Sequence, residues 1–415
     1  MTWETLYCFS VFRTVKTIIK AKAIFDGRDI LESHQVEINN GIISKVGNDL
    51  EGDMVIDLGD EFLMPGMVDA HIHLFGATTG NLLQEAFSKH PEELMLNAIP
   101  WLKSILKAGF TSVRDCGNTN SVFLREAVRR NIIPGPTIFA AGTTMSQTFG
   151  HGEFSHSVPI EIYEQMRMTE ICDGVESCIK GARRVLRRGS DFIKIFSTGG
   201  VLSQRDGPEQ EQFTVEEIQA IVREARKAGT YVASHAHGDT GARNAIVGGV
   251  KTLEHGTLIT ESTLKMMAER EVSLTPTLSI QTLITRYGKE LGINSWGLEK
   301  NRSLHEGITK VLSMANKMGI NILAGTDLGF ITGKDIDIGK NAMELVLLTE
   351  MGGLTNIQAL RAATGNFARL GHRAGMISEG YPADLVSLAG DPTEDIKEVL
   401  KVSKVFKDGK EVNLN

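Results

Sequence analysis

Residues 65–76 read PGMVDAHIHLFG and mark the point at which the character of the chain changes. From about Thr17 to Leu63, short alternating runs are separated by Asp-Gly and Asn-Gly pairs, a pattern typical of a small antiparallel sheet. After Pro65, continuous apolar runs alternate with longer helical stretches, which indicates parallel strand-helix-strand units. The quoted stretch is therefore predicted to contain the first strand of a parallel sheet.

The run at 66–73 is the first of eight buried strand-like segments. The others lie at 111–116, 137–142, 192–198, 231–237, 252–256, 272–278 and 321–327. Helical stretches are predicted between them at 92–108, 120–131, 175–189, 214–228 and 298–318. The one at 214–228 begins with a capping box of Thr214 and Glu217. Eight parallel strands are the number that closes a (β/α)8 TIM barrel, and we expect this α/β fold.

The chain returns to strand and turn texture from Pro382 to Val412. The simplest interpretation is that both ends of the chain share one small domain. We therefore predict a composite β-sandwich of residues 1–65 and 376–415 beside a barrel of residues 66–375. The first dozen residues join no motif.

Composition excludes several classes of protein. The 415 residues are 41% hydrophobic and 23% charged, which excludes collagen-like, disordered and polytopic membrane chains. A net charge of -7 gives no electrostatic reason to expect nucleic acid as a partner. Four scattered cysteines, the absence of a signal-peptide pattern and the lack of a long apolar run predict a cytoplasmic protein with no membrane partner.

Ionisable residues fall where the predicted strands end. The candidates are His71, His73, Lys194, His235, His255 and Asp327. In a barrel, such positions project into one mouth, and a His-x-His pair on a strand directs both imidazoles to the same side. A lone histidine at a strand end is more often structural, but the joint placement favours a metal site. Histidines with a carboxylate suit zinc, with manganese, iron or cobalt as alternatives.

Lys194 differs from the other candidates because it lies inside the apolar run FIKIF. Burying a charged ammonium there is costly, so the amine must be paired, deprotonated or chemically modified. A neutral amine near two metal ions can take up CO2 and become a carbamate, whose oxygens would bridge them.

Five motifs together resemble the amidohydrolase superfamily over roughly residues 17–412: PGMVDAHIHLFG, DFIKIFSTGGVLS, VASHAHG, TLEHGTL and AGTDLG. The resemblance implies two divalent metal ions and a carboxylated Lys194 that bridges them together with a hydroxide. It assigns His71, His73 and Asp327 to one metal and His235 and His255 to the other. Asp327 would then act as general base and acid, taking the proton of the hydroxide and passing it to the leaving nitrogen.

Within the superfamily, the sequence is similar to the metal-dependent dipeptidases and carboxypeptidases once labelled prolidases. This implies hydrolysis of a small peptide or N-acyl amino acid, with release of the C-terminal residue. His151 is the predicted catalytic and substrate contact, with His237, Arg286 and Tyr287 as further substrate-binding candidates. Each also has an ordinary structural interpretation, as a loop cap, an orienting group or a surface pair.

Three acidic residues, Asp206, Glu209 and Glu211, follow the fourth strand and would favour a C-terminal Arg or Lys. Near the end of the second strand, Arg114 and Asp115 are interpreted as a structural salt bridge. Cys172 and Cys178 are interpreted as ordinary thiols. Barrels of this type often self-associate, so a homo-oligomer is expected.

Two alternatives to a dipeptidase remain open. One is a cyclic amidohydrolase or deaminase of the imidazolonepropionase type, which would differ in the loop after the third strand and in the carboxylate-binding residues. The other is a barrel without catalysis that serves as a scaffold, for which missing ligands would be the sign. No ligand is missing from the set named above.

Overall fold

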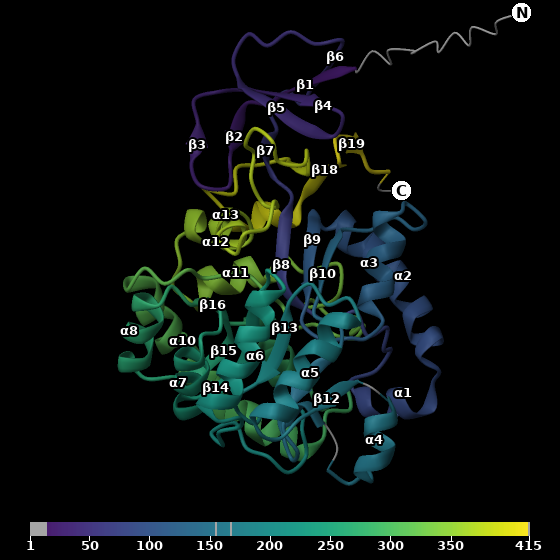
Figure 1. Ribbon diagram of the computed structural model, residues 1–415. Helices are drawn as coiled ribbons and strands as arrows, with labels where there is room; N and C mark the ends of the chain where they lie inside the picture. The colour runs from purple at the N-terminus through teal and green to yellow at the C-terminus, as the bar shows by residue number, and fades with distance from the viewer. Residues whose placement is uncertain (1–14, 154–155, 167, 414–415) are drawn as a thin grey trace, which may run out of the picture.

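The computed structural model describes residues 15–153, 156–166 and 168–413 (Figure 1). The first fourteen residues of the predicted terminal domain lie outside this range. In Figure 1, strands from both ends of the chain gather in an upper region, and the alternating helices and strands of the middle of the chain form the larger lower region.

The lower region is built on two sheets of parallel strands. One sheet has the order β10-β9-β8 and consists of β8 (Met67–Ile72), β9 (Phe110–Asp115) and β10 (Thr137–Ala140). A second has the order β12-β11-β13-β14-β15-β16. Its members are β11 (Thr144–Ser146), β12 (Thr169–Ile171), β13 (Ile193–Phe196), β14 (Val232–Gly238), β15 (Thr252–Leu258) and β16 (Ser273–Thr275). All pairings in both sheets are parallel, as predicted.

Backbone hydrogen bonds join the two sheets at both ends. The amide of Asp191, just before β13, donates to the carbonyl of Ala140 at the end of β10 (2.8 Å). On the other side, Leu323 donates to Leu274 of β16 (2.8 Å), and Ala70 of β8 donates to Ala324 (2.8 Å). These bonds connect the eight predicted segments in a ring, which is the connectivity of an α/β fold that contains a TIM barrel.

The eighth segment, predicted as a strand over 321–327, departs from regular pairing. It makes one isolated parallel bridge, from Ile322 to Leu274. Its backbone still bonds to both neighbouring strands, but at Thr326 the amide (3.0 Å) and the hydroxyl (2.7 Å) donate to the Asp69 carboxylate, so a side chain replaces a strand partner at that residue. β11 and β12 were not predicted by the sequence.

Helices follow the parallel strands, and the five predicted ones are found with shifted ends. They are α2 (Pro91–Lys107), α3 (Ser121–Arg129), α5 (Val175–Arg187), α6 (Val215–Lys227) and α10 (Ser295–Lys317). The capping box of α6 is confirmed, since the Thr214 hydroxyl accepts from the Glu217 amide (3.3 Å) and Glu217 accepts from the Thr214 amide (2.8 Å). Further helices are α1 (Leu82–Ser88), α4 (Ile160–Met166), α7 (Asp239–Gly248), α8 (Glu261–Glu269), α9 (Leu278–Tyr287), α11 (Met343–Glu350), α12 (Asn356–Ala362), α13 (Gly365–Ala368), η1 (His151–Glu153) and η2 (Ile396–Leu400).

The upper region contains two sheets. One has the order β5-β4-β1-β6, from β1 (Lys16–Lys20), β4 (Gln35–Asn39), β5 (Ile42–Gly47) and β6 (Met54–Asp57). The other has the order β19-β18-β17-β7-β2-β3, from β2 (Ala23–Phe25), β3 (Ile30–Leu31), β7 (Phe62–Pro65), β17 (Leu385–Leu388), β18 (Val402–Lys407) and β19 (Lys410–Glu411). Pairing of β7 with β17 shows that both chain ends share one sheet.

The prediction of a small antiparallel sheet was wrong for two pairs, because β1 with β6 and β2 with β7 run parallel. Side chains from both sheets meet in one apolar core, including Ile19, Val36, Ile43, Leu63 and Phe406. Burial of these side chains holds the two sheets together. The β-sandwich and its boundaries at 65/66 and 375/376 stay predictions.

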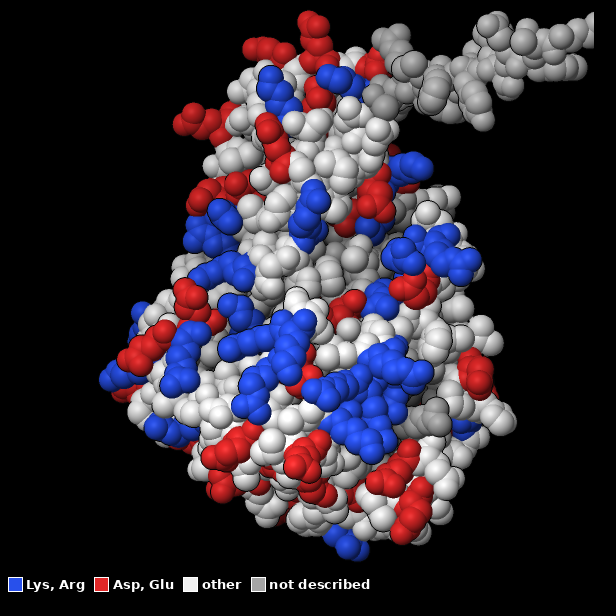
Figure 2. Space-filling model, in the orientation of Figure 1, with Lys and Arg blue, Asp and Glu red and all other residues white. Residues whose placement is uncertain are grey.

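Lysine and arginine gather over α5 and α6 on the face shown in Figure 2. Much of this charge is locally balanced, because Arg184 and Arg188 pair with Glu170 (2.8 and 2.9 Å), and Arg183 pairs with Glu224 (2.8 Å). No helix among the described residues is long and apolar enough to cross a membrane.

His372 makes the stability of the fold depend on pH. Its ring packs against Phe139 and Phe367, with centroids 4.2 and 5.1 Å away, and its Nε2 lies 3.1 Å from the Tyr231 hydroxyl. Burial lowers the pKa of His372 to about 4. The unfolded chain, with an ordinary histidine pKa of about 6.5, therefore binds more protons between these values. The contribution of His372 to stability is complete above about pH 6.5 and declines as the pH falls toward 4.

We expect His372→Gln to flatten the pH dependence of the free energy of unfolding between about pH 6.5 and 4. The measurement is urea unfolding at several pH values. His34→Gln, at an exposed histidine, is the matched control and should leave the slope unchanged. Equal slopes in the wild type and His372→Gln would contradict the assignment.

Candidate metal centre

The predicted metal-binding side chains meet at the carboxyl ends of the parallel strands. Ligand atoms of His71, His73 and Asp327 lie within 4.8 Å of one another, and so do those of His235, His237 and His255. The structure therefore brings five of the six predicted ligands into two groups of three and adds His237 to the second group. The centroids of His71 and His255 are 5.3 Å apart, so the two groups adjoin.

Asp327 links the two histidines of the first group. Its Oδ1 lies 3.3 Å from Nε2 of His71 and 3.0 Å from Nε2 of His73. One carboxylate oxygen and two imidazole nitrogens thus converge on one point, as metal ligation requires.

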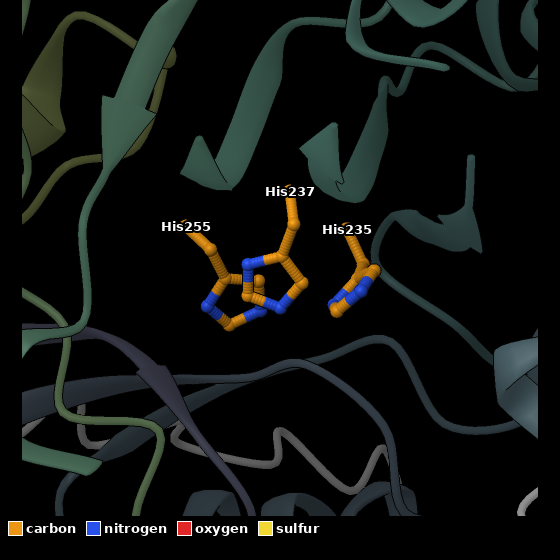
Figure 3. Close-up of side chains that lie close together, drawn as sticks. All are labelled: His235, His237 and His255. Carbon is orange, nitrogen blue, oxygen red and sulfur yellow. The ribbon is translucent and has the colours of Figure 1, made fainter. Parts of the chain in front are cut away.

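Figure 3 shows the three histidines of the second group with their rings turned toward one another. His235 and His237 lie on β14, and His255 lies on β15. The ring centroid of His255 is 4.6 Å from that of His235 and 4.8 Å from that of His237. Residues 235 and 237 share one side of β14 because side chains alternate along a strand.

Hydrogen bonds at the other ring nitrogen orient these imidazoles. Nδ1 of His73 lies 3.0 Å from the Gly117 carbonyl, and Nδ1 of His255 lies 2.7 Å from the Thr277 hydroxyl. His235 uses Nε2 instead, 3.1 Å from the Gly199 carbonyl. Each ring keeps one nitrogen for a ligand, which is how partners behind metal-binding histidines fix the ring.

Electrostatics keeps the second group uncharged. Burial, reinforced by neighbouring imidazoles, lowers the pKa of His235 and His255 well below the usual range, and burial lowers that of His237 to about 3. A neutral imidazole is the form that binds a metal ion. The neutral imidazoles of this group are therefore suitable ligands for a divalent cation.

Two of the candidate ligands have a left-handed backbone. The φ angles are +72° at His255 and +57° at Asp327. Such conformations cost on the order of 1–3 kcal/mol in a non-glycine residue and concentrate at functional sites. The backbone is thus locally distorted at His255, within β15, and at Asp327, the two positions from which these side chains enter the centre.

Lys194 is buried in β13, with 2% of its surface exposed. Among the described residues, no carboxylate pairs with its Nζ, and the ring of Phe196 lies 5.8 Å from it. An unpaired buried ammonium is costly, so the surroundings of Lys194 fit a modified amine.

Behind His71 lies a buried ion pair that the sequence analysis missed. Nη2 of Arg114 donates to both oxygens of Glu254 (2.8 and 2.9 Å), and Oε2 of Glu254 accepts from Nδ1 of His71 (2.8 Å). The predicted pairing of Arg114 with Asp115 was wrong, because Asp115 accepts from the backbone amides of Leu74 (2.7 Å) and Gly117 (3.0 Å). The sequence signal that could have revealed this pair is the glutamate, Glu254, within the apolar strand TLEHG.

The Arg114–Glu254 pair stays ionised although burial opposes both charges. Attraction between the two groups raises the pKa of Arg114 and holds that of Glu254 well below its usual range. The guanidinium also donates to the Ala70 carbonyl (2.5 Å) and to the Thr252 hydroxyl (3.0 Å). Arg114 thereby connects β8, β9 and β15 beneath the metal centre.

His151 lies beside the second group, and its role as a catalytic residue and substrate contact stays a prediction. It begins η1, and its ring centroid is 4.3 Å from that of His235. Nδ1 of His151 is 2.7 Å from the Ser203 hydroxyl, which in turn donates to Asp206. Burial lowers the pKa of His151 to about 4 despite the attraction of Asp206.

Arg286 and Tyr287 end α9 and bind other side chains. Nη1 of Arg286 is 2.9 Å from Asp335, and the Tyr287 ring lies 5.1 Å from Nζ of Lys334. Asp206 is buried, with Lys300 3.7 Å away, whereas Glu209 and Glu211 are exposed. The substrate-binding roles predicted for Arg286 and Tyr287 stay predictions.

Histidine and carboxylate ligands at the ends of parallel strands in an α/β fold are typical of metal-dependent hydrolases. The particular family follows from comparison with known proteins. Residues 62–412 match the model of the amidohydrolase family, and the chain belongs to that family. It is a hydrolytic enzyme whose family generally uses two metal ions to hydrolyse amide and related bonds.

Individual relatives agree. The chain is similar to an ochratoxinase from Aspergillus niger, at 33% identity over 84% of this chain and 75% of the relative. It also resembles the structure of a prolidase complexed with N-methylphosphonate-L-proline, with TM-score 0.87, 31% identity and coverage of 96% and 99% of the two chains. An Xaa-Pro dipeptidase with bound methionine has TM-score 0.85, 30% identity and the same coverage. The chain therefore falls in the prolidase-like branch.

We expect Arg114→Met to destabilise the protein by about 3–5 kcal/mol, because it leaves the Glu254 carboxylate buried without its partner. The double variant Arg114→Met/Glu254→Gln should recover part of this loss, since the stranded charge is gone. Urea unfolding of the wild type, both single variants and the double variant gives the coupling energy. Additive effects of the two substitutions would contradict this account.

Proposed function

We propose that this enzyme hydrolyses a peptide-type amide bond and releases a C-terminal amino acid, as a dipeptidase or carboxypeptidase acting on a small peptide or an N-acyl amino acid. The observation that carries the proposal is the pair of adjoining ligand groups, with Asp327 bonded between His71 and His73. The prolidase and the Xaa-Pro dipeptidase to which the chain is similar support the substrate class.

The proposed cofactors are two divalent ions, with zinc as the ion that suits the donor set. His71, His73 and Asp327 would hold one, and His235 and His255 the other, with a CO2-derived carbamate on Lys194 as the shared ligand. When bound, the pair of ions polarises a carbonyl and lowers the pKa of water. Among the described residues, no ion pair joins a carboxylate to the buried Lys194, and this supports the carbamate.

Asp327 is the proposed general base and acid. Its carboxylate takes the proton of the attacking water and delivers it to the leaving nitrogen, which needs it because an amine anion leaves poorly. Asp327 lies beside His71 and His73, so its carboxylate is at the proposed centre, where both transfers would occur.

His151 is proposed to contact the scissile carbonyl or the substrate carboxylate, and His237 to contact the substrate or orient the neighbouring histidine. A preference for a C-terminal Arg or Lys would depend on Glu209 and Glu211, because Lys300 already lies near the charge of Asp206. Carboxylate binding by Arg286 would require release from Asp335. These assignments are the most direct to test by varying the substrate.

The first test is release of free amino acids by the zinc-loaded enzyme from dipeptides and N-acyl amino acids with different C-terminal residues. The library includes cyclic amides and an imidazolone, which represent the alternative reaction. Turnover of linear amides alone supports the proposal. Turnover confined to the cyclic compounds would overturn it in favour of the imidazolonepropionase type.

Asp327→Asn should lower kcat by at least about a hundredfold, the contribution typical of a general base and acid. An amide keeps an oxygen donor, so most bound metal should remain. The measurements are turnover of the best linear substrate and metal content by mass spectrometry. Wild-type kcat in this variant would refute the role of Asp327.

Removal of CO2 tests the carbamate on Lys194. Wild-type protein purified without CO2 should hold less metal than protein prepared with bicarbonate, and added bicarbonate should restore the content. Lys194→Met, which cannot form a carbamate, should hold less metal under both conditions. A bicarbonate-independent metal content in the wild type would exclude the carbamate.

A further inference from the structure

A cavity of about 790 Å³ begins at His73 of the metal centre. It extends between α1, the start of α2, the segment after β9 and the start of α10. Cavities of this size hold a small organic molecule. Because His73 also contacts Asp327 (3.0 Å), the cavity adjoins the metal centre.

Large apolar side chains dominate the lining. Phe75 stacks on His73, with centroids 4.9 Å apart and planes inclined by 2°. Further lining side chains are Leu82, Phe87, Phe196, Leu202 and Trp296. Phe87 is 43% exposed, so an apolar group in the cavity would cover it. This surface gains most by burying an aromatic or branched aliphatic group.

Charge is almost absent from the described lining, which contains no lysine or arginine and one carboxylate, that of Glu85. That carboxylate is already satisfied by the amide of Thr78 (2.8 Å), the hydroxyl of Thr79 (2.7 Å) and Nζ of Lys89 (2.9 Å). The other polar side chains are uncharged amides and hydroxyls, such as Asn118 and Gln204. Neither a carboxylate nor an ammonium finds a free opposite charge among these residues.

We propose that the cavity binds the acyl side of the substrate, and that this acyl group is large, apolar and uncharged. The inference rests on the proposed function and names its substrate class: an N-acyl amino acid with an aromatic or bulky aliphatic acyl group, in preference to a free dipeptide. A dipeptide would place its terminal ammonium in the cavity, and the C-terminal carboxylate of the leaving residue must lie outside it.

The test compares leucine amides that share one leaving group, with 2-naphthoyl, acetyl and glycyl on the acyl side. We expect kcat/KM of the zinc-loaded enzyme to be at least about tenfold higher for naphthoyl-leucine than for acetyl-leucine, in line with the added apolar surface. Glycyl-leucine should be the poorest of the three. Equal or better turnover of glycyl-leucine would overturn the inference while leaving the proposed function intact.

Calorimetric titration with 2-naphthoate and acetate gives a readout that does not depend on turnover. Both ligands present the same carboxylate to the centre. Tighter binding of naphthoate than of acetate therefore measures the contribution of the cavity to the affinity. Tighter naphthoate binding with no hydrolysis of any amide would support the cavity assignment and overturn the proposed function. Equal affinities would overturn the inference.

Phe87→Glu places a carboxylate on the exposed wall of the cavity. It should weaken naphthoate binding severalfold, and should raise kcat/KM for 6-aminohexanoyl-leucine relative to naphthoyl-leucine. Phe123→Glu is the matched control, since Phe123 is an exposed phenylalanine on α3 that does not line the cavity. An equal effect of both substitutions would count against the cavity as the binding site.

Discussion

The buried pairing of Arg114 with Glu254 is the interaction on which the metal centre depends. A guanidinium and a carboxylate are both removed from water here, and their hydrogen bonds offset the cost, since each guanidinium nitrogen has an acceptor. The pair fixes the spacing of β8, β9 and β15 and directs Nδ1 of His71 away from the centre. The orientation of His71 is thus set by an ion pair that lies behind it.

Much of the lower region could be predicted from the sequence, because each buried parallel strand is a continuous apolar run and each active residue follows at its end. The candidate ligands His71, His73, His235, His255 and Asp327 could be named in this way. The eighth segment was also predicted, but not its irregular pairing, in which the Asp69 side chain accepts the hydrogen bonds of Thr326. Which carboxylate a buried arginine selects also depends on distances between strands far apart in the chain.

Side-chain partners at the surface of the site were the least predictable. Arg286 could be named as a cation near a strand end, but its bond to Asp335 forms across a separation of 49 residues. Asp206 likewise reads as a free acid in sequence, yet it is buried beside His151 and Lys300. A substrate meets only the charges that are left unpaired once these ion pairs have formed. The sequence alone does not show which charges those are.

The left-handed backbone at His255 and Asp327 has an evolutionary consequence. Branched side chains fit this conformation poorly, whereas glycine and asparagine fit it well. At either position, replacement by glycine would relieve backbone strain while removing a candidate metal ligand; asparagine would do the same at His255. A lineage could therefore abandon catalysis through a single substitution that the fold tolerates, and inactive descendants of such enzymes should keep their architecture and differ first at these two positions.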